Sequence, residues 1–252
     1  MKKRVPVFIT ILLCVCLIFP MTALAKTYTT SDTDIHVDID DSRWYVFTRD
    51  NIQNNPELEE LGISVEYMEE VFRKEKAYMD AVLVYEDGSA LELFIRKSDT
   101  DSKIVNLSNY DDDKVLELAK ELAKKQSAED FSVHETQYKF AKLEYFDANY
   151  NYYLCEFFTI VNKESYTLTF QSPTPYGETE YAEIEAIINS VRFDVDASLK
   201  EDTGKTVLAS TIRGAVIGGV CGGAVALVGV LAKKKKAKKA SSESNPGTTD
   251  SL

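Results

Sequence analysis

The strongest constraint on this chain is an uncharged apolar run near its carboxyl end that a block of lysines follows at once. Residues 214–232 contain no charged side chain. As an α-helix rising about 1.5 Å per residue, the run would extend about 28 Å, close to the hydrocarbon thickness of a bilayer. Lysines occupy 233–236, 238 and 239, and lysines stay on the cytoplasmic side of a span. The pattern predicts one transmembrane helix over 213–232, with the carboxyl end in the cytoplasm.

The amino terminus has the three parts of a secretory signal peptide. Residues 2–4 are basic, residues 5–19 are mostly apolar, and Ala23-Leu24-Ala25 is a small-x-small cleavage site. The apolar run is short for a span, which favours cleavage over an uncleaved anchor. We therefore predict five parts: a signal peptide over 1–25, an extracytoplasmic domain over 26–196, a juxtamembrane tether over 197–212, a transmembrane helix over 213–232, and a basic, then disordered cytoplasmic tail over 233–252.

Small residues recur at every fourth position of the predicted span. Gly214, Gly218 and Gly222 would form one stripe that lets two helices approach closely. A homodimer formed through this stripe is one hypothesis. The alternative is that the glycines have no such role, because glycine is common in membrane helices.

The net charge of the predicted exported part limits the classes of partner that it can bind. Residues 26–232 hold 39 acidic and 20 basic residues, a net charge of about −19. Such a body repels phosphate backbones, which argues against nucleic acid as a partner. Basic peptides, cations and neutral ligands stay open. Cys155 is the only cysteine between the two apolar runs, so we expect no internal disulfide and a buried, unreactive thiol.

Local patterns predict an α+β domain of five to seven antiparallel strands and three helices. Period-2 alternation and turn residues, Asp87-Gly88 above all, predict strands over 35–39, 44–47, 79–86, 90–96, 137–146, 151–161 and 166–172. Helix-end residues and turn spacing predict the three helices over 65–77, 111–125 and 178–190, and in addition one short helix between Asn55-Pro56 and Gly62. Glu75 is charged where the apolar stripe of 65–77 should continue, so that stripe is predicted to be short.

The carboxyl half of the domain resembles a known superfamily. The run YYLCEFFTIVNKESYTLTFQSPTPYGETEYAEIEAIINSVRF is similar to the strand, acidic helix and "I.NS.RF" ending of PsbP/Mog1-like domains, and Trp44-Tyr45-Val46-Phe47 is similar to their "W.vf" strand. The resemblance covers about 34–194. It implies an antiparallel sheet sandwiched by helices that binds other proteins as an assembly, accessory or adaptor factor. The superfamily shares no active site, so no functional residue is transferred.

No catalytic or nucleotide-binding motif is present in the sequence. Asp34, His36, Asp38 and Asp40 share one face of a strand, and His36 with Asp38 is a conceivable chelating pair. A run of four such ligands is too long for one ion, since each two-residue step covers about 6.6 Å. The wet face of an edge strand explains the pattern without a metal. We therefore predict no metal site and no cofactor, and leave open whether the acidic face binds a cation.

Aromatic residues gather near one predicted hairpin end. They are Tyr145, Phe146, Tyr150, Tyr152 and Tyr153. Such a cluster is a hypothetical interaction patch for a protein or surface ligand. The alternative is that these rings pack across the strands like other strand aromatics.

The leading functional hypothesis is a non-enzymatic binding or accessory domain, held outside the cell membrane by a single C-terminal span. A first alternative is an exported hydrolase or metal-dependent enzyme with a dispersed site, suggested by His36 and the acidic face. A second alternative is a structural membrane protein that self-associates through its glycine stripe.

Overall fold

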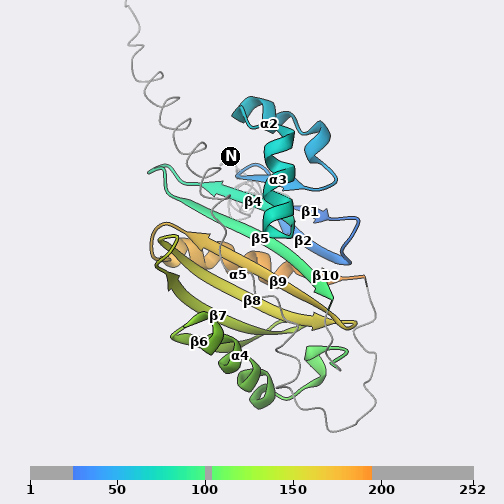
Figure 1. The fold of residues 1–252 in the computed structure, drawn as a ribbon, viewed down its shortest axis with the longest axis vertical. Helices are drawn as coiled ribbons and strands as arrows, with labels where there is room; N and C mark the ends of the chain where they lie inside the picture. The colour runs from blue at the N-terminus through green and yellow to red at the C-terminus, as the bar shows by residue number, and fades with distance from the viewer. Residues whose placement is uncertain (1–24, 100–103, 195–252) are drawn as a thin grey trace, which may run out of the picture.

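The computed structural model describes residues 25–99 and 104–194 (Figure 1). The predicted tether, transmembrane helix and tail lie outside these residues, and so does the signal peptide apart from Ala25. The stripe of Gly214, Gly218 and Gly222 lies outside them too. Within the described ranges, no helix has both the length and the apolar character that crossing a membrane requires.

The described chain forms two antiparallel sheets and a small set of helices. The strands are β1 Lys26–Thr29, β2 Ile35–Ile39, β3 Trp44–Thr48, β4 Ala77–Val84, β5 Ala90–Asp99, β6 Asp130–Glu135, β7 Lys139–Asp147, β8 Tyr152–Val161, β9 Glu164–Ser172 and β10 Arg192–Phe193. The helices are α2 Pro56–Leu61, α3 Val65–Glu75, α4 Asp112–Gln126 and α5 Glu178–Ser190, with 3-10 turns η1 Ile52–Asn54 and η2 Leu107–Asn109.

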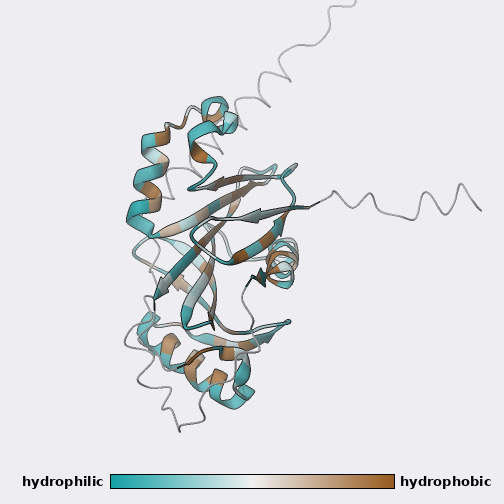
Figure 2. Ribbon diagram, turned by 90° about the vertical axis from the view of Figure 1, so that its right-hand side faces the viewer, coloured by the Kyte–Doolittle hydropathy of each residue, from teal (hydrophilic) through white to brown (hydrophobic). Residues whose placement is uncertain are grey.

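A seven-stranded sheet, ordered β3-β4-β5-β9-β8-β7-β6, forms the middle layer of the domain (Figure 2). Because side chains alternate along a strand, β5 points Leu91, Leu93 and Ile95 to one face and Glu92, Phe94 and Arg96 to the other. The first face carries the main core, under α5 and the three-stranded sheet β1-β2-β10. On the second face α3 covers the β4 end of the sheet, and α4 covers the β7 end.

The α+β architecture with antiparallel strands is confirmed, and the strand predictions need correction at four strands. β1, β6 and β10 were not predicted as strands, and the described residues form ten strands in two sheets. β2 is not an edge strand, because it lies between β1 and β10. β10 has two residues, too few for any periodicity, and its pairing with β2 joins segments far apart in the sequence.

Local chemistry explains several element boundaries. Asn55 caps α2 by accepting a hydrogen bond from the Glu57 N–H at 2.9 Å, and Gly62 ends that helix with φ 63°. Gly88 takes φ 87° in the turn between β4 and β5. α3 ends at Glu75, because Lys76 adopts the left-handed conformation (φ 52°) and starts the reversal into β4.

A buried ion pair fixes the end of α3 to the sheet. Glu75, expected at the edge of a short stripe, is only 3% exposed, and Arg96 of β5 is 5% exposed. Arg96 Nη2 lies 3.5 Å from Glu75 Oε2, its Nε donates to the Glu75 carbonyl at 3.0 Å, and its Nη1 donates to Thr169 Oγ1 at 3.0 Å. The charge of Glu75 is therefore part of the core rather than of the surface.

We expect Glu75→Leu to cost about 3–5 kcal/mol of unfolding free energy, because it leaves the Arg96 guanidinium buried without its partner. Adding Arg96→Met should restore most of this loss. Glu70→Leu, at an exposed position of the same helix, is the matched control and should change stability by about 0.5 kcal/mol or less. Urea denaturation measures all three. Equal effects of Glu75→Leu and Glu70→Leu would show that the pair does not hold α3.

Candidate binding site

Four of the five aromatic residues predicted as a patch are divided between the two faces of the sheet, and Tyr150 lies in the turn between β7 and β8. The ring of Tyr145 packs against Tyr152, which is 6% exposed, and Leu154. Phe146 lies on the opposite face with its ring 4.9 Å from that of Tyr153. Phe146 and Tyr150 are 46% and 42% exposed. The part that can meet a partner is thus smaller than the sequence cluster, and the patch stays a prediction.

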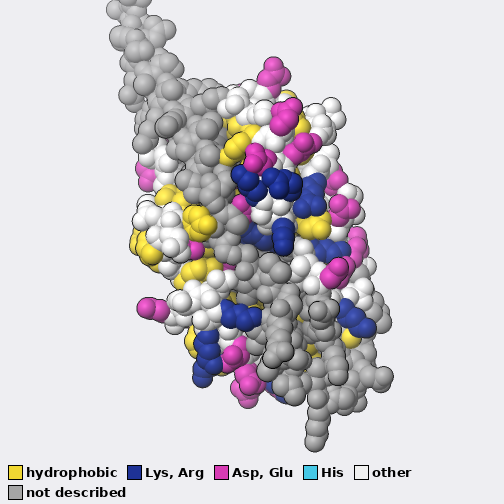
Figure 3. Space-filling view, viewed as in Figure 1, with side chains coloured by type: hydrophobic (Ala, Val, Ile, Leu, Met, Phe, Trp, Pro, Cys, Tyr) yellow, Lys and Arg dark blue, Asp and Glu magenta, His cyan; other side chains and the backbone are white. Residues whose placement is uncertain are grey.

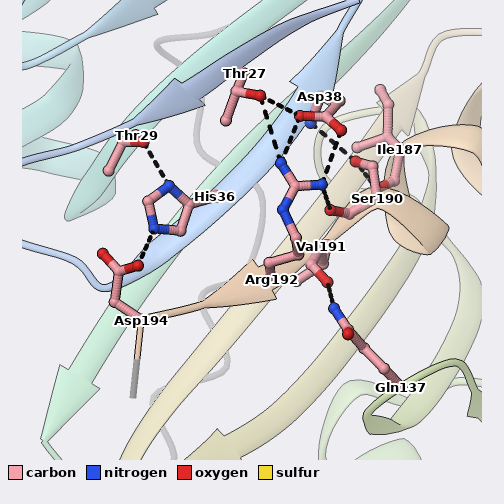
Figure 4. A network of polar contacts seen from close by, with 10 residues as sticks. All are labelled: Thr27, Thr29, His36, Asp38, Gln137, Ile187, Ser190, Val191, Arg192 and Asp194. Carbon is pink, nitrogen blue, oxygen red and sulfur yellow. Dashed lines mark hydrogen bonds and ion pairs between the residues drawn. The ribbon is translucent and has the colours of Figure 1, made fainter. Parts of the chain in front are cut away.

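The polar face of β2 is tied to neighbouring strands by the chain's own groups (Figure 4). Arg192 of β10 donates two hydrogen bonds of 2.8 Å to the carboxylate of Asp38 and lowers its pKa to about 2. His36 Nδ1 lies 2.6 Å from Thr29 Oγ1 and its Nε2 lies 2.7 Å from Asp194 Oδ1. The positive charge beside Asp38 is therefore a guanidinium of the protein, and both ring nitrogens of His36 link β2 to flanking segments.

The second histidine lies elsewhere and meets a different acid. His134 Nε2 is 3.6 Å from Glu185 Oε2, and its ring packs at 5.3 Å against Phe157. Burial lowers the pKa of His134. Among the residues that the structure describes, no group of three or more His, Cys, Asp or Glu side chains is placed to hold a metal ion. Cys155 is buried, as predicted, and burial raises the pKa of its thiol.

A strip of buried polar residues crosses the second face of the large sheet between α3 and α4. It contains Asp80, Glu92, Arg96, Glu156, Thr169 and Gln171, each 5% exposed or less. Gln171 Nε2 donates to Glu92 Oε2 at 2.5 Å, and Glu92 in turn interacts with the carboxyl group of Asp80. Burial raises the pKa of Asp80 to about 8 and that of Glu156 to about 7. The strip therefore holds protons that exposed carboxyl groups would release.

A hollow of about 570 Å³ opens beside the end of α3, and we call it the basic hollow. Its lining combines cations from three parts of the chain, two buried apolar side chains and a tyrosine ring, and consists of Arg49, Ile52, Gln53, Glu69, Phe72, Arg73, Lys76, Tyr78 and Lys97. Figure 3 shows Lys and Arg side chains gathered on this face near the end of α3. Four cations and one acid line the basic hollow of an otherwise acidic domain.

Two cations of the basic hollow carry charge that no described carboxylate neutralises. The guanidinium of Arg49 lies over the Tyr78 ring, 4.0 Å from its centroid, and its Nε donates to the Ala77 carbonyl at 2.8 Å. These contacts hold the group in place. Neither Arg49 nor Lys76 forms an ion pair within the described residues, whereas Lys97 Nζ lies 2.9 Å from Glu164 Oε1. A planar guanidinium held by stacking suits a carboxylate or phosphate.

Sequence reasoning missed the basic hollow for a physical reason. Basic residues at the end of a helix are an ordinary complement to its dipole, so Arg73 and Lys76 alone carry no functional signal. The two other cations indicate a binding site. Arg49 follows β3, and Lys97 lies on β5. Only the pairing of β3, β4 and β5 brings these residues to the end of α3.

Comparisons with known proteins concern the fold alone. No protein-family model matches the chain, and a search of curated proteins finds no match. Among solved structures, the chain is similar to cyanobacterial PsbP (CyanoP) of Synechocystis sp. PCC 6803, at 10% identity and a TM-score of 0.40. The match covers 69% of this chain and 95% of that one. Its name is that of the PsbP group which the sequence pattern resembles.

We expect the buried strip to make stability fall as pH rises from about 4 to about 8. Asp80 and Glu156 have folded pKa values above their unfolded ones, so their contribution is fully present below the unfolded pKa. It is lost as pH rises through about 7 and about 8, because the unfolded chain releases protons that the folded chain keeps. Burial and the neighbouring Asp80 also raise the pKa of Glu92. Asp80→Asn with Glu92→Gln and Glu156→Gln should therefore flatten this slope and stabilise the protein at pH 8, in urea denaturation at a series of pH values. An unchanged slope would show that other groups set it.

Proposed function

We propose that this protein is a non-enzymatic binding or accessory domain, held outside the cell membrane by its C-terminal span, and that the basic hollow binds a negatively charged group of its partner. The observation that carries the proposal is the pair of unneutralised cations, Arg49 and Lys76, in a hollow with buried apolar walls. Charged groups of a partner add most to affinity where apolar surface reduces their contact with water.

The charge distribution of the domain supports this site. A strongly acidic body repels anions in general, so an anion binds best where local cations outnumber acids. The basic hollow satisfies this condition: in the described part of its lining Glu69 is the one acid, and the amide of Gln53 donates to that acid at 2.8 Å. The volume of about 570 Å³ is of the size that ligand sites have.

Membrane attachment is the second part of the proposal. It is supported by the uncharged run over 214–232, the lysines after it and the amino-terminal signal pattern. β10 joins the sheet that also contains β1, so both ends of the predicted exported domain belong to one three-stranded sheet.

Protease added to intact cells should degrade the extracytoplasmic domain while leaving the 233–252 tail protected. The reason is that the lysine block keeps the carboxyl end in the cytoplasm. Immunoblots with one epitope tag in the domain and one at the carboxyl end measure this. A protected domain, or a chain that washes away with the soluble fraction, would contradict the membrane part of the proposal.

Crosslinking on intact cells tests the binding part. Tagged wild-type chain should capture a reproducible partner, and the Arg49→Glu/Lys76→Glu variant should reduce that capture about tenfold or more, since two attractive charges become repulsive. Lys120→Glu/Lys124→Glu, which reverses two exposed charges on α4, should capture as well as wild type. Capture of nothing but the chain itself, or equal loss in both variants, would contradict the proposal.

A further inference from the structure

We propose that the anionic group bound by the basic hollow belongs to an extended acidic peptide segment of the partner, whose neighbouring apolar side chain occupies a second hollow. This inference rests on the proposed function and adds the ligand class. The carboxylates of the segment face Arg49 and Lys76. Its uncharged part lies along η1, in the second hollow.

The second hollow lies next to the first and has a different chemistry. It measures about 640 Å³ and shares Ile52 and Gln53 with the basic hollow. We call it the amide hollow, because amide and apolar side chains dominate its lining, among them Asn54, Leu58 and Ile63. Among the described residues that line it there is no lysine or arginine, and Glu59 is the one charged side chain. Together the two hollows form a site that is cationic at one end and neutral to acidic at the other.

This polarity determines how a ligand lies. A compact anion such as inorganic phosphate needs only the cations and leaves the amide hollow unused. An extended peptide uses both hollows, because the exposed amide of Asn54 offers a donor and an acceptor to backbone C=O and N–H groups. The amides of Gln53 and Asn55 already bond to Glu69, Val46 and Glu57 within the domain. Leu58, Ile63 and Val65 offer an apolar wall to a side chain of the segment. Like-charge repulsion from Glu59 keeps the acidic end of the segment in the basic hollow.

Addition of the peptide as a strand on β3 is not the mode that the geometry favours. β3 is an edge of the large sheet, yet its Val46 carbonyl accepts hydrogen bonds from the amides of Asn51 at 3.0 Å and Asn55 at 3.3 Å. The Thr48 N–H donates to Asn51 Oδ1 at 2.8 Å. These contacts occupy part of the exposed strand edge, so side-chain recognition in the two hollows is the mode that we propose.

The test uses the full chain in nanodiscs of zwitterionic lipid and a short fluorescent peptide that alternates glutamate with leucine. Fluorescence anisotropy measures its affinity. Arg49→Glu/Lys76→Glu should weaken binding about tenfold or more, and Arg49→Ala/Lys76→Ala is the milder variant if charge reversal disturbs folding. Val65→Glu places an acid in the amide hollow at a helix start that tolerates acids, and should also weaken binding several-fold. Lys120→Glu/Lys124→Glu is the control.

Each outcome separates the two proposals. Binding that both hollow variants weaken, with no binding of a lysine–leucine peptide, supports the acidic peptide. If inorganic phosphate or a leucine-free acidic peptide binds equally well and Val65→Glu has no effect, the basic hollow still binds anions, but the peptide inference is overturned. If binding requires anionic lipid in the nanodisc, the basic hollow is assigned to lipid headgroups, and the peptide inference is again overturned. No binding of any anionic probe overturns both proposals.

Discussion

The guanidinium of Arg96 is the group on which the geometry of the candidate site depends. It is buried on the second face of the large sheet, where only hydrogen bonds and an opposite charge can compensate for lost hydration. Glu75 supplies both its carboxylate and its backbone carbonyl, and Thr169 supplies a hydroxyl. These contacts fix the last turn of α3 against β5 and β9. The basic hollow lies at that turn, so the positions of Arg73 and Lys76 depend on a guanidinium that is almost fully buried.

The two faces of the large sheet have different roles. One face is apolar and packs against α5 and the three-stranded sheet, in which β2 is held by Arg192 and His36 (Figure 4). The other face is apolar only beneath α3 and α4 and polar between them. Burial of apolar side chains on both faces stabilises the fold. The polar strip costs stability, because buried carboxyl groups are weakly compensated, and its cost grows as pH rises.

Elements with strong local signals were predictable from the sequence. Asp87-Gly88 predicted the β4–β5 hairpin, Asn55-Pro56 and Gly62 predicted α2, and the acidic start and basic end of 111–125 predicted α4. Features that depend on distant partners were not predictable. The burial of Glu75 follows from Arg96, the central place of β2 follows from β10, and the basic hollow needs residues from Arg49 to Lys97. The net charge of residues 26–232, about −19, is a sum over the whole domain and gives no sign of that local positive site.

The most direct test of the central claim observes the Arg49 side chain itself. NMR spectra of arginine Nε–H groups, recorded on the full chain in zwitterionic nanodiscs, report each guanidinium separately. When the glutamate–leucine peptide is added, the account predicts a saturable shift of the Arg49 signal. The Arg192 signal should stay in place, because Asp38 already occupies that guanidinium. An Arg49 signal that does not move while the peptide binds would place the ligand elsewhere and contradict the account.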